Sequence, residues 1–90
     1  MHSIVHKKKL IARVRRVRGQ VEAVERALEA ERGCDHVVHA VIAARGALNS
    51  LAAELLCEHL EAHVGAPEVP DAERTEAAGE LSRIIRRLVS

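Results

Sequence analysis

The chain has 90 residues, a net charge of only +1 at pH 7 and no Phe, Trp or Tyr. A chain of this length forms one small domain, and its core must come from Leu, Val, Ile and Ala. Such a core is thin, and association with further copies is the ordinary remedy. Without aromatic rings there is no platform for base stacking, which disfavours RNA or single-stranded DNA as a partner.

The start of the chain, MHSIVHKKKL, lacks the hydrophobic region of a secretion signal. We also expect no apolar run of membrane-spanning length. Two cysteines in such a chain indicate thiol or metal chemistry rather than a disulfide scaffold. The sequence therefore predicts a cytoplasmic protein without a membrane partner.

The first helix is expected over residues 5–30. Its apolar residues recur at intervals of three and four, which places them in one stripe along the helix. The segment ERGCD ends this helix, because Gly33 suits a helix C-terminus and Asp35 favours the start of the next helix. The stripe consists of Leu10, Val14, Val17, Val21, Val24 and Leu28.

The second helix is expected over residues 34–64 and has a broad apolar surface. One face carries Val37, Val41, Ala44, Leu48, Leu51 and Leu55, and Ile42, Leu56 and Leu60 widen it. Because so wide a surface needs burial on more than one side, it predicts packing against helices of other copies.

A third helix is expected over residues 71–88, after the segment GAPEVPD has ended the second one with one Gly and two Pro. No strand pattern or internal repeat is evident. The sequence therefore predicts a single all-α domain, residues 1–90, of three helices. The inward-facing residues of the third helix are expected to be Leu81, Ile84, Ile85 and Leu88.

The first twenty positions hold seven basic residues and no acidic residue; acids begin at Glu22. A concentrated basic segment indicates contact with phosphates. A solvated helix face is the alternative. The basic residues are Lys7, Lys8, Lys9, Arg13, Arg15, Arg16 and Arg18.

Two histidines, His59 and His63, lie four residues apart near the end of the second helix. This spacing places them one turn apart on one face, so both can bind one metal ion. Two exposed histidines without a ligand are the alternative. Cys57 lies on the far side of the helix from His59, and we expect a small buried residue or a bystander thiol there. A zinc hydrolase motif is disfavoured, because Leu60 stands where that motif has glutamate.

Cys34 opens the second helix, where the helix dipole favours the thiolate. It is roughly 37 Å from His59 along an α-helix, so one chain cannot bring both to one ion. If this helix pairs antiparallel with its copy in a second chain, Cys34 of one chain meets His59 and His63 of the other, and twofold symmetry creates two such sites. An antiparallel hairpin of the first two helices would bring the N-terminal amine and His2 to the same end, as a chelate suited to Ni(II) or Cu(II).

The segments RVRRVRGQVEAVERALE and GCDHVVHAVIAARGALNSLAAELLCEHLEAHV, followed by a short third helix, resemble the CsoR/RcnR/FrmR family of bacterial repressors. The similarity runs from about residue 8 to residue 88. It combines an Arg-rich RGQ segment, a Cys that opens the second helix, an AxRGAxN centre and a His near the helix end. The resemblance implies an antiparallel four-helix-bundle dimer that assembles into a tetramer, a dimer of dimers. It also implies that the effector-free protein binds duplex DNA and is released when the effector binds.

Members of this family differ in effector and ligand set. Nickel and cobalt sensors of the RcnR and DmeR type use an N-terminal His, the Cys and two later His, which match His2, Cys34, His59 and His63. Copper sensors have Cys at the position of His63, and formaldehyde sensors commonly expose a proline where this chain has His2. One thiolate with several nitrogen donors suits Ni(II) or Co(II), with Zn(II) as an alternative. The resemblance therefore implies a metal-released repressor that controls a metal efflux or homeostasis gene.

The resemblance also makes Arg13 and Arg16 the leading DNA contacts, since they lie three apart on one face of the first helix. Gln20 and Arg45 add polar contacts to DNA or hold the tetramer. No helix-turn-helix is evident, so we expect readout of phosphates and duplex shape. The supporting basic residues are Arg15, Arg18, Lys7, Lys8 and Lys9.

Two other functions fit the same residues. A formaldehyde-responsive repressor of the same fold would use Cys34 and the N-terminal amine. A metal store or chaperone would bind no DNA, and the basic, acid-free N-terminal segment weighs against it. We expect His6, His36 and His39 to be exposed or to surround the metal site without binding the ion. No nucleophile–base pair is evident, so the sequence predicts neither an enzyme nor a small-molecule substrate.

Overall fold

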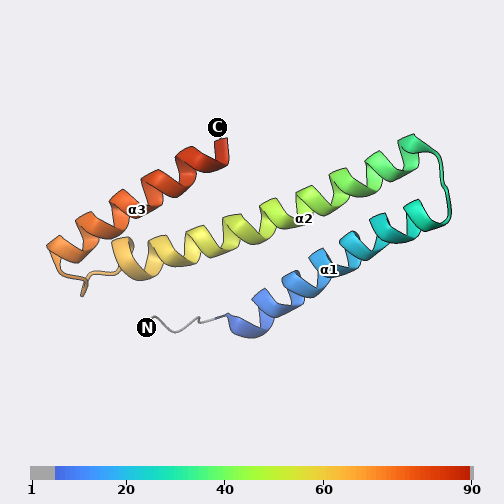
Figure 1. Cartoon of the computed structure of the whole chain (residues 1–90). Helices are drawn as coiled ribbons and strands as arrows, with labels where there is room; N and C mark the ends of the chain where they lie inside the picture. The colour runs from blue at the N-terminus through green and yellow to red at the C-terminus, as the bar shows by residue number, and fades with distance from the viewer. Residues whose placement is uncertain (1–5, 90) are drawn as a thin grey trace. The chain divides into compact units, whose positions relative to one another are not determined.

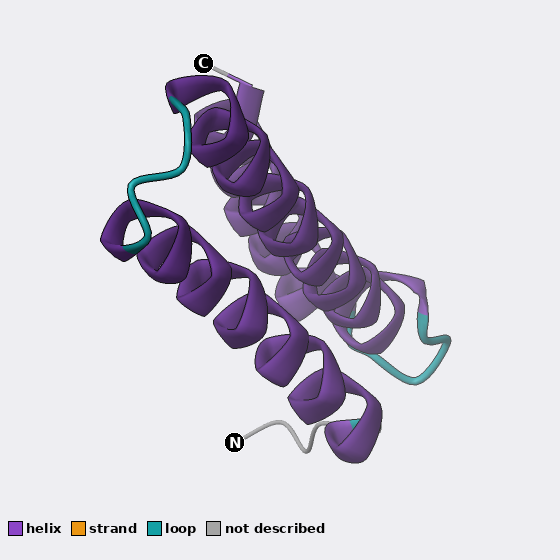
Figure 2. Ribbon diagram, turned by 90° about the vertical axis from the view of Figure 1, so that its right-hand side faces the viewer, coloured by secondary structure: helices purple, strands orange, loops and turns teal. Residues whose placement is uncertain are grey.

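The computed structural model describes residues 6–89, so His2 lies outside the described residues. This part of the chain forms α1 (Lys7–Glu29), α2 (Cys34–Leu60) and α3 (Asp71–Val89), with a π-helical turn, η1 (Glu61–Gly65), after α2 (Figure 1). From residue 6 to residue 89 the chain contains helices and loops but no strand (Figure 2). The prediction of an all-α fold with three helices is confirmed. The helix expected to run to residue 64 changes from α to π geometry at Glu61.

The chain divides into two compact units, Met1–Ala53 and Glu54–Ser90, and the boundary falls within α2. The first unit holds α1 and the N-terminal part of α2, which run antiparallel. The second unit holds the C-terminal part of α2, η1 and α3, and in it α3 packs against η1.

The apolar stripe of α1 is only partly buried in the first unit. Leu10 is buried, but the exposed fractions of Val14, Val21 and Leu28 are 50%, 52% and 60%. Ala44 is the buried residue of α2 among those described. Alternate members of the predicted stripe therefore lack a covering helix within one chain.

In the second unit, too, some apolar residues are not covered by another helix of the same chain. Leu81 is buried, as expected, whereas Ile84, Ile85 and Leu88 are about half exposed. The prediction that all four residues of α3 face inward is therefore wrong for a single chain. The reason is that η1 and the end of α2 cover only one side of α3, so its remaining apolar residues need another helix.

The end of α1 is capped by a residue that the sequence analysis overlooked. Glu31 has a φ of 54° and takes the left-handed conformation expected of Gly33. The N–H of Glu31 donates to the carbonyl of Leu28 at 3.1 Å, and the N–H of Arg32 donates to that of Ala27 at 3.0 Å. This is the Schellman pattern, which satisfies carbonyls that the helix end leaves free. Gly33 serves instead as the residue before α2, and the side chain of Asp35 lies over it.

The segment Cys34–Gly65 is long and apolar enough, by length and composition, to cross a membrane. The expectation that no run approaches this length is therefore wrong. The cause is the broad apolar surface of α2, of which little is buried within the described chain. The same length and composition also occur in the core helices of soluble assemblies, where other helices cover such a surface.

Replacing Glu31 by glycine is expected to stabilise the protein. Glycine adopts the left-handed conformation without the steric cost that a Cβ atom carries, so Glu31→Gly should raise the free energy of unfolding by about 0.5–1 kcal/mol. Urea denaturation followed by circular dichroism, at one fixed protein concentration, measures this change.

The matched control is Glu25→Gly, which removes the same charge from an exposed position inside α1. There glycine should lower the free energy of unfolding by about 1 kcal/mol. Equal destabilisation by both substitutions would contradict the assigned cap.

Candidate metal and nucleic-acid sites

His59 and His63 lie side by side at the end of the long helix. His59 belongs to the last turn of α2 and His63 to η1, and their ring centroids are 4.5 Å apart with an interplanar angle of 42°. The Nε2 atom of His59 is buried and has no hydrogen-bond partner. The predicted proximity of the two imidazoles is confirmed.

The histidine pair fits a metal ion in its donor chemistry. A buried polar nitrogen without a partner costs free energy, which binding of a ligand at that nitrogen would recover. Imidazole nitrogens are common ligands of divalent transition metals. Among residues 6–89, however, no group of three or more His, Cys, Asp or Glu is placed to hold an ion. The pair can therefore form only part of a metal site.

Cys34, the thiol expected to complete the site, is exposed and is the first residue of α2. His59 is the penultimate residue of the same helix. The two residues thus lie at the first and the penultimate position of one helix, as the sequence predicted, and neither belongs to a group of three potential ligands within residues 6–89.

Cys57 is an exposed free thiol, which contradicts the first of the two alternatives, a small buried residue, and agrees with the second, a bystander thiol. It lines an apolar groove of about 320 Å³ in the second unit, between the end of α2 and α3. Three further histidines, His6, His36 and His39, are exposed, as expected. The groove is lined by Leu56, Cys57, Leu60, Ala78, Leu81, Ser82 and Ile85.

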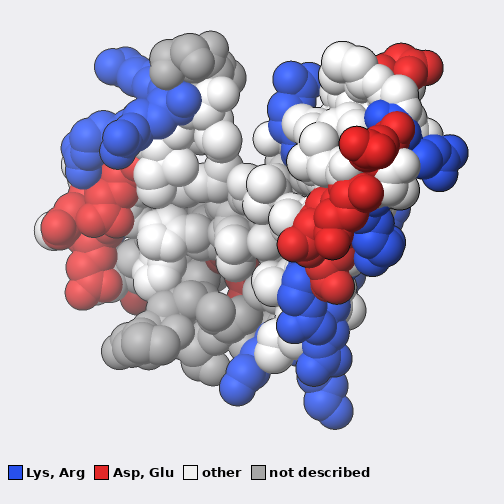
Figure 3. Space-filling model, turned by 45° about the vertical axis from the view of Figure 1, so that its right-hand side comes forward, with Lys and Arg blue, Asp and Glu red and all other residues white. Residues whose placement is uncertain are grey.

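The seven basic residues of the sequence analysis lie in the first half of α1. Six are exposed, and Arg13 is partly buried. Figure 3 shows Lys and Arg side chains in groups that adjoin groups of Asp and Glu. Arg18 faces Glu22 across one turn at 3.9 Å, in an exposed ion pair that contributes little to stability. The N-terminal half of α1 therefore carries only basic charges, and the acidic residues begin in its C-terminal half.

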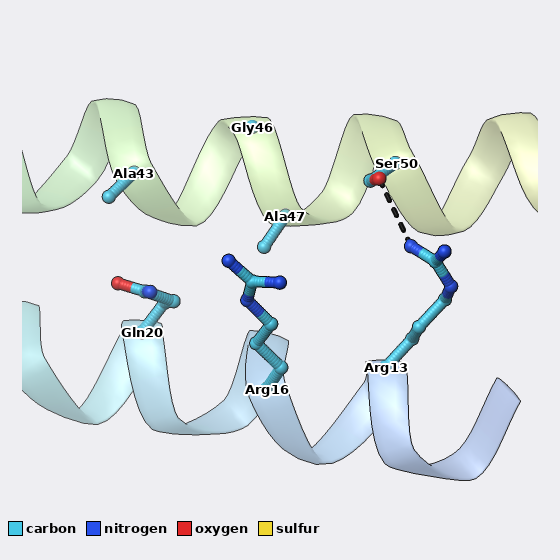
Figure 4. A pocket seen from close by; sticks show the side chains of 7 residues that line it. All are labelled: Arg13, Arg16, Gln20, Ala43, Gly46, Ala47 and Ser50. Carbon is cyan, nitrogen blue, oxygen red and sulfur yellow. Dashed lines mark hydrogen bonds between the residues drawn. The ribbon is translucent and has the colours of Figure 1, made fainter. Parts of the chain in front are cut away.

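Arg13 and Arg16 face a groove of about 320 Å³ between α1 and the N-terminal part of α2 (Figure 4). Arg13 Nη1 donates a hydrogen bond to Ser50 Oγ at 3.1 Å, and the guanidinium of Arg16 points toward Ala47. Gln20 lines the same groove, which holds no acidic residue. Such a set of donors suits anions, because arginine donates to phosphate oxygens in a planar fork.

Sequence reasoning missed the part that α2 plays in this groove. The residues facing the arginines are small, which lets the long side chains of α1 lie between the helices. Their spacing of three and four is the signal that could have revealed this face. They are Ala43, Gly46, Ala47 and Ser50.

Comparison with known proteins agrees with these features. Residues 6–87 match the model of a family described as metal-sensitive transcriptional repressors. An uncharacterized protein in the bioA 5′ region of Serratia marcescens is 40% identical over 85 residues, which cover 94% of this chain and 93% of that protein. A transcriptional repressor RcnR homolog from Escherichia coli O139:H28 (strain E24377A / ETEC) is 38% identical over 63 residues, 70% of each chain.

Among solved structures, a glutamate-to-histidine variant of the formaldehyde-responsive regulator FrmR from Salmonella enterica serovar Typhimurium is similar, with a TM-score of 0.84 and 39% identity. The alignment covers 97% of this chain and 98% of the FrmR chain.

This protein is therefore a transcriptional repressor rather than an enzyme. It belongs to the family of metal-sensitive transcriptional repressors that includes CsoR, RcnR and FrmR. Membership confirms the resemblance inferred from the motifs, and it implies DNA binding and oligomerisation.

Proposed function

We propose that this protein is a cytoplasmic repressor that binds duplex DNA when effector-free and is released when Ni(II) or Co(II) binds. The proposed ligands are His2, Cys34, His59 and His63, and the controlled gene serves metal efflux or homeostasis. The observation that carries the proposal is the His59–His63 pair, with a buried nitrogen that lacks a partner. Membership of a family of metal-sensitive repressors supports a metal effector.

The proposed metal site is shared between two chains. Cys34 begins α2 and His59 lies near its end, and residues 6–89 hold no group of three potential ligands. In an antiparallel dimer, Cys34 of one chain would reach the histidine pair of the other. We propose that two such dimers form a tetramer. The half-exposed apolar residues of α1, α2 and α3 supply surface for both contacts.

The proposed DNA surface is the basic half of α1. Arg13 and Arg16 would donate to phosphate oxygens, supported by Lys7, Lys8, Lys9, Arg15 and Arg18. Arg13 is already oriented by its hydrogen bond to Ser50 on α2. A change in the position of α1 against α2 would therefore move the arginines relative to the phosphates, which is how effector binding can weaken the complex.

A formaldehyde-responsive repressor is the second candidate. The similarity to FrmR over nearly the whole chain favours it, as does the exposed thiol of Cys34 at the start of α2. In this chemistry the thiol sulfur and the N-terminal amine each form a bond to the formaldehyde carbon. The carbonyl oxygen then leaves as water.

A direct test compares effectors for relief of DNA binding. The protein is bound to duplex DNA from the region flanking its gene, and Ni(II), Co(II), Zn(II), Cu(I) or formaldehyde is added in separate titrations read by fluorescence anisotropy. Release at the lowest concentration by Ni(II) or Co(II) is the expected result. Release by formaldehyde alone would overturn the metal proposal in favour of the second candidate.

Removing one arginine from the basic half of α1 should lower both DNA affinity and its dependence on salt. Each neutralised phosphate contributes about 0.9 to the slope of log K against log salt, so Arg16→Ala should reduce the slope by about 1 for every chain of the assembly in which this arginine neutralises one phosphate. Arg26→Ala is the matched control, since it removes the same charge from the last turn of α1. The prediction fails if both variants change the slope equally.

Mixing two inactive variants should restore metal sites if those sites are shared between chains. Cys34→Ser and His63→Ala proteins, each deficient in Ni(II) binding, are unfolded together and refolded as a mixture. Half of the dimers are then mixed, and each mixed dimer has one intact site, so about a quarter of wild-type sites should return. A Ni(II) titration that recovers no tight sites from the mixture would show that the ligands come from one chain.

Formaldehyde treatment separates the two candidates at the level of covalent chemistry. A methylene bridge between Cys34 and the N-terminal amine adds the mass of one carbon atom, because water leaves. Under the metal proposal, intact-mass spectrometry after treatment with low formaldehyde should show no such bridge in excess of that in a Cys34→Ser control. A stoichiometric bridge that depends on Cys34 would favour the second candidate.

A further inference from the structure

The turn that joins η1 to α3, residues 66–70, is held by one side chain. Arg74, in the first turns of α3, donates from Nη2 to the carbonyl oxygens of Ala66 at 3.2 Å and Val69 at 3.0 Å. Its Nη1 atom lies 3.5 Å from Asp71 Oδ1. The partly buried guanidinium therefore contacts both ends of the turn from α3.

The composition of this turn explains why a side chain has to supply hydrogen-bond donors to its carbonyl groups. Pro67 and Pro70 have no backbone N–H, so the turn has few donors of its own. The N–H of Val69 donates to the carbonyl of Ala66 at 3.3 Å, and the N–H of Arg74 donates to that of Pro70 at 2.9 Å. Arg74 Nη2 supplies the further donors to both carbonyls while Nη1 faces Asp71, and a lysine ammonium has only one nitrogen, which cannot take both positions.

The clamped turn directly follows the segment that carries His63. η1 ends at Gly65, and Ala66 is its C-terminal flanking residue. π-helical turns are rare, and those that occur are often found at functional sites. Because η1 places the ring of His63 4.5 Å from that of His59, the geometry of the pair depends on how the end of η1 is anchored to α3.

We propose that Arg74 is a positioning residue for the effector site. By tying the 66–70 turn to α3, it fixes the π-helical turn and so holds His63 beside His59. The proposal rests on the proposed function, in which both histidines bind the metal. Groups that orient metal ligands from outside the coordination sphere typically change affinity by 10–100-fold when they are removed.

The experiment uses the full-length protein and three substitutions on α3. Arg74→Gln removes the guanidinium and its charge, Arg74→Lys keeps the charge on a single nitrogen, and Arg86→Gln removes the same charge from an exposed position of the same helix. Metal-free protein is examined by NMR of the histidine imidazoles. Affinity for Co(II) is measured from the visible absorption of the bound ion, in each variant and in each variant combined with His63→Ala.

Arg74→Gln is expected to shift or broaden the His63 imidazole signals of the metal-free protein and to weaken Co(II) binding by on the order of 10-fold. Arg74→Lys should restore only part of this affinity, and Arg86→Gln should change neither quantity. In the His63→Ala background, Arg74→Gln should have no further effect, since it acts through His63. A general loss of stability would instead weaken binding equally in both backgrounds.

Two outcomes would overturn the proposal in different ways. Unchanged His63 signals in metal-free Arg74→Gln protein would show that the clamp does not position the ring, whatever the metal does. If the signals change but His63→Ala leaves Co(II) binding intact, then the metal ligand set is wrong. The clamp would in that case be a packing device without a role in sensing.

Discussion

The molecule depends on apolar surface that one chain cannot bury. Thirteen large apolar side chains of the described residues are at least 38% exposed, and they lie on all three α-helices. Covering the remaining half of each contributes about 1 kcal/mol, so the set is worth on the order of 10 kcal/mol per chain. That is comparable to the whole net stability of an ordinary domain. Association between copies, which the family membership implies, would therefore contribute substantially to the stability of this fold.

The same need for a second chain explains how the proposed metal site could form. Cys34 and His59 lie at opposite ends of α2 and so cannot bind the same ion within one chain. Antiparallel pairing of two α2 helices in a dimer would bring Cys34 of one chain to the histidines of the other. The basic half of α1 packs on the small-residue face of α2 through Arg13 and Ser50. Effector and DNA would thus both act on α2, and a coupling of a few kcal/mol between their binding is enough to switch a promoter.

The helices could be predicted from sequence because periodicity and helix-ending residues are local signals. The spacing of apolar residues on α1 and the two prolines before α3 placed these elements to within a few residues of their ends. The adjacency of His59 and His63 followed from their spacing alone. A spacing of four keeps two side chains on one face in an α-helix, and they stay close in the π-helical turn.

Other features depend on contacts that no local pattern encodes. Glu31, and not Gly33, takes the left-handed conformation, since the position of the cap is set by where the α1 hydrogen bonds end. The π-helical turn and its clamp by Arg74 involve residues up to eight positions apart across two prolines. Burial was overestimated for Ile84, Ile85 and Leu88, because periodicity identifies an apolar face but not the chain that covers it.

Sedimentation equilibrium of the metal-free protein over a wide concentration range tests the central claim most directly. The account predicts a folded species of four chains, dissociating to dimers before any monomer is seen, with loss of helix when monomers form. A folded, fully helical monomer that still bound Ni(II) tightly would contradict it, because neither the exposed apolar faces nor a shared site would then need a second chain.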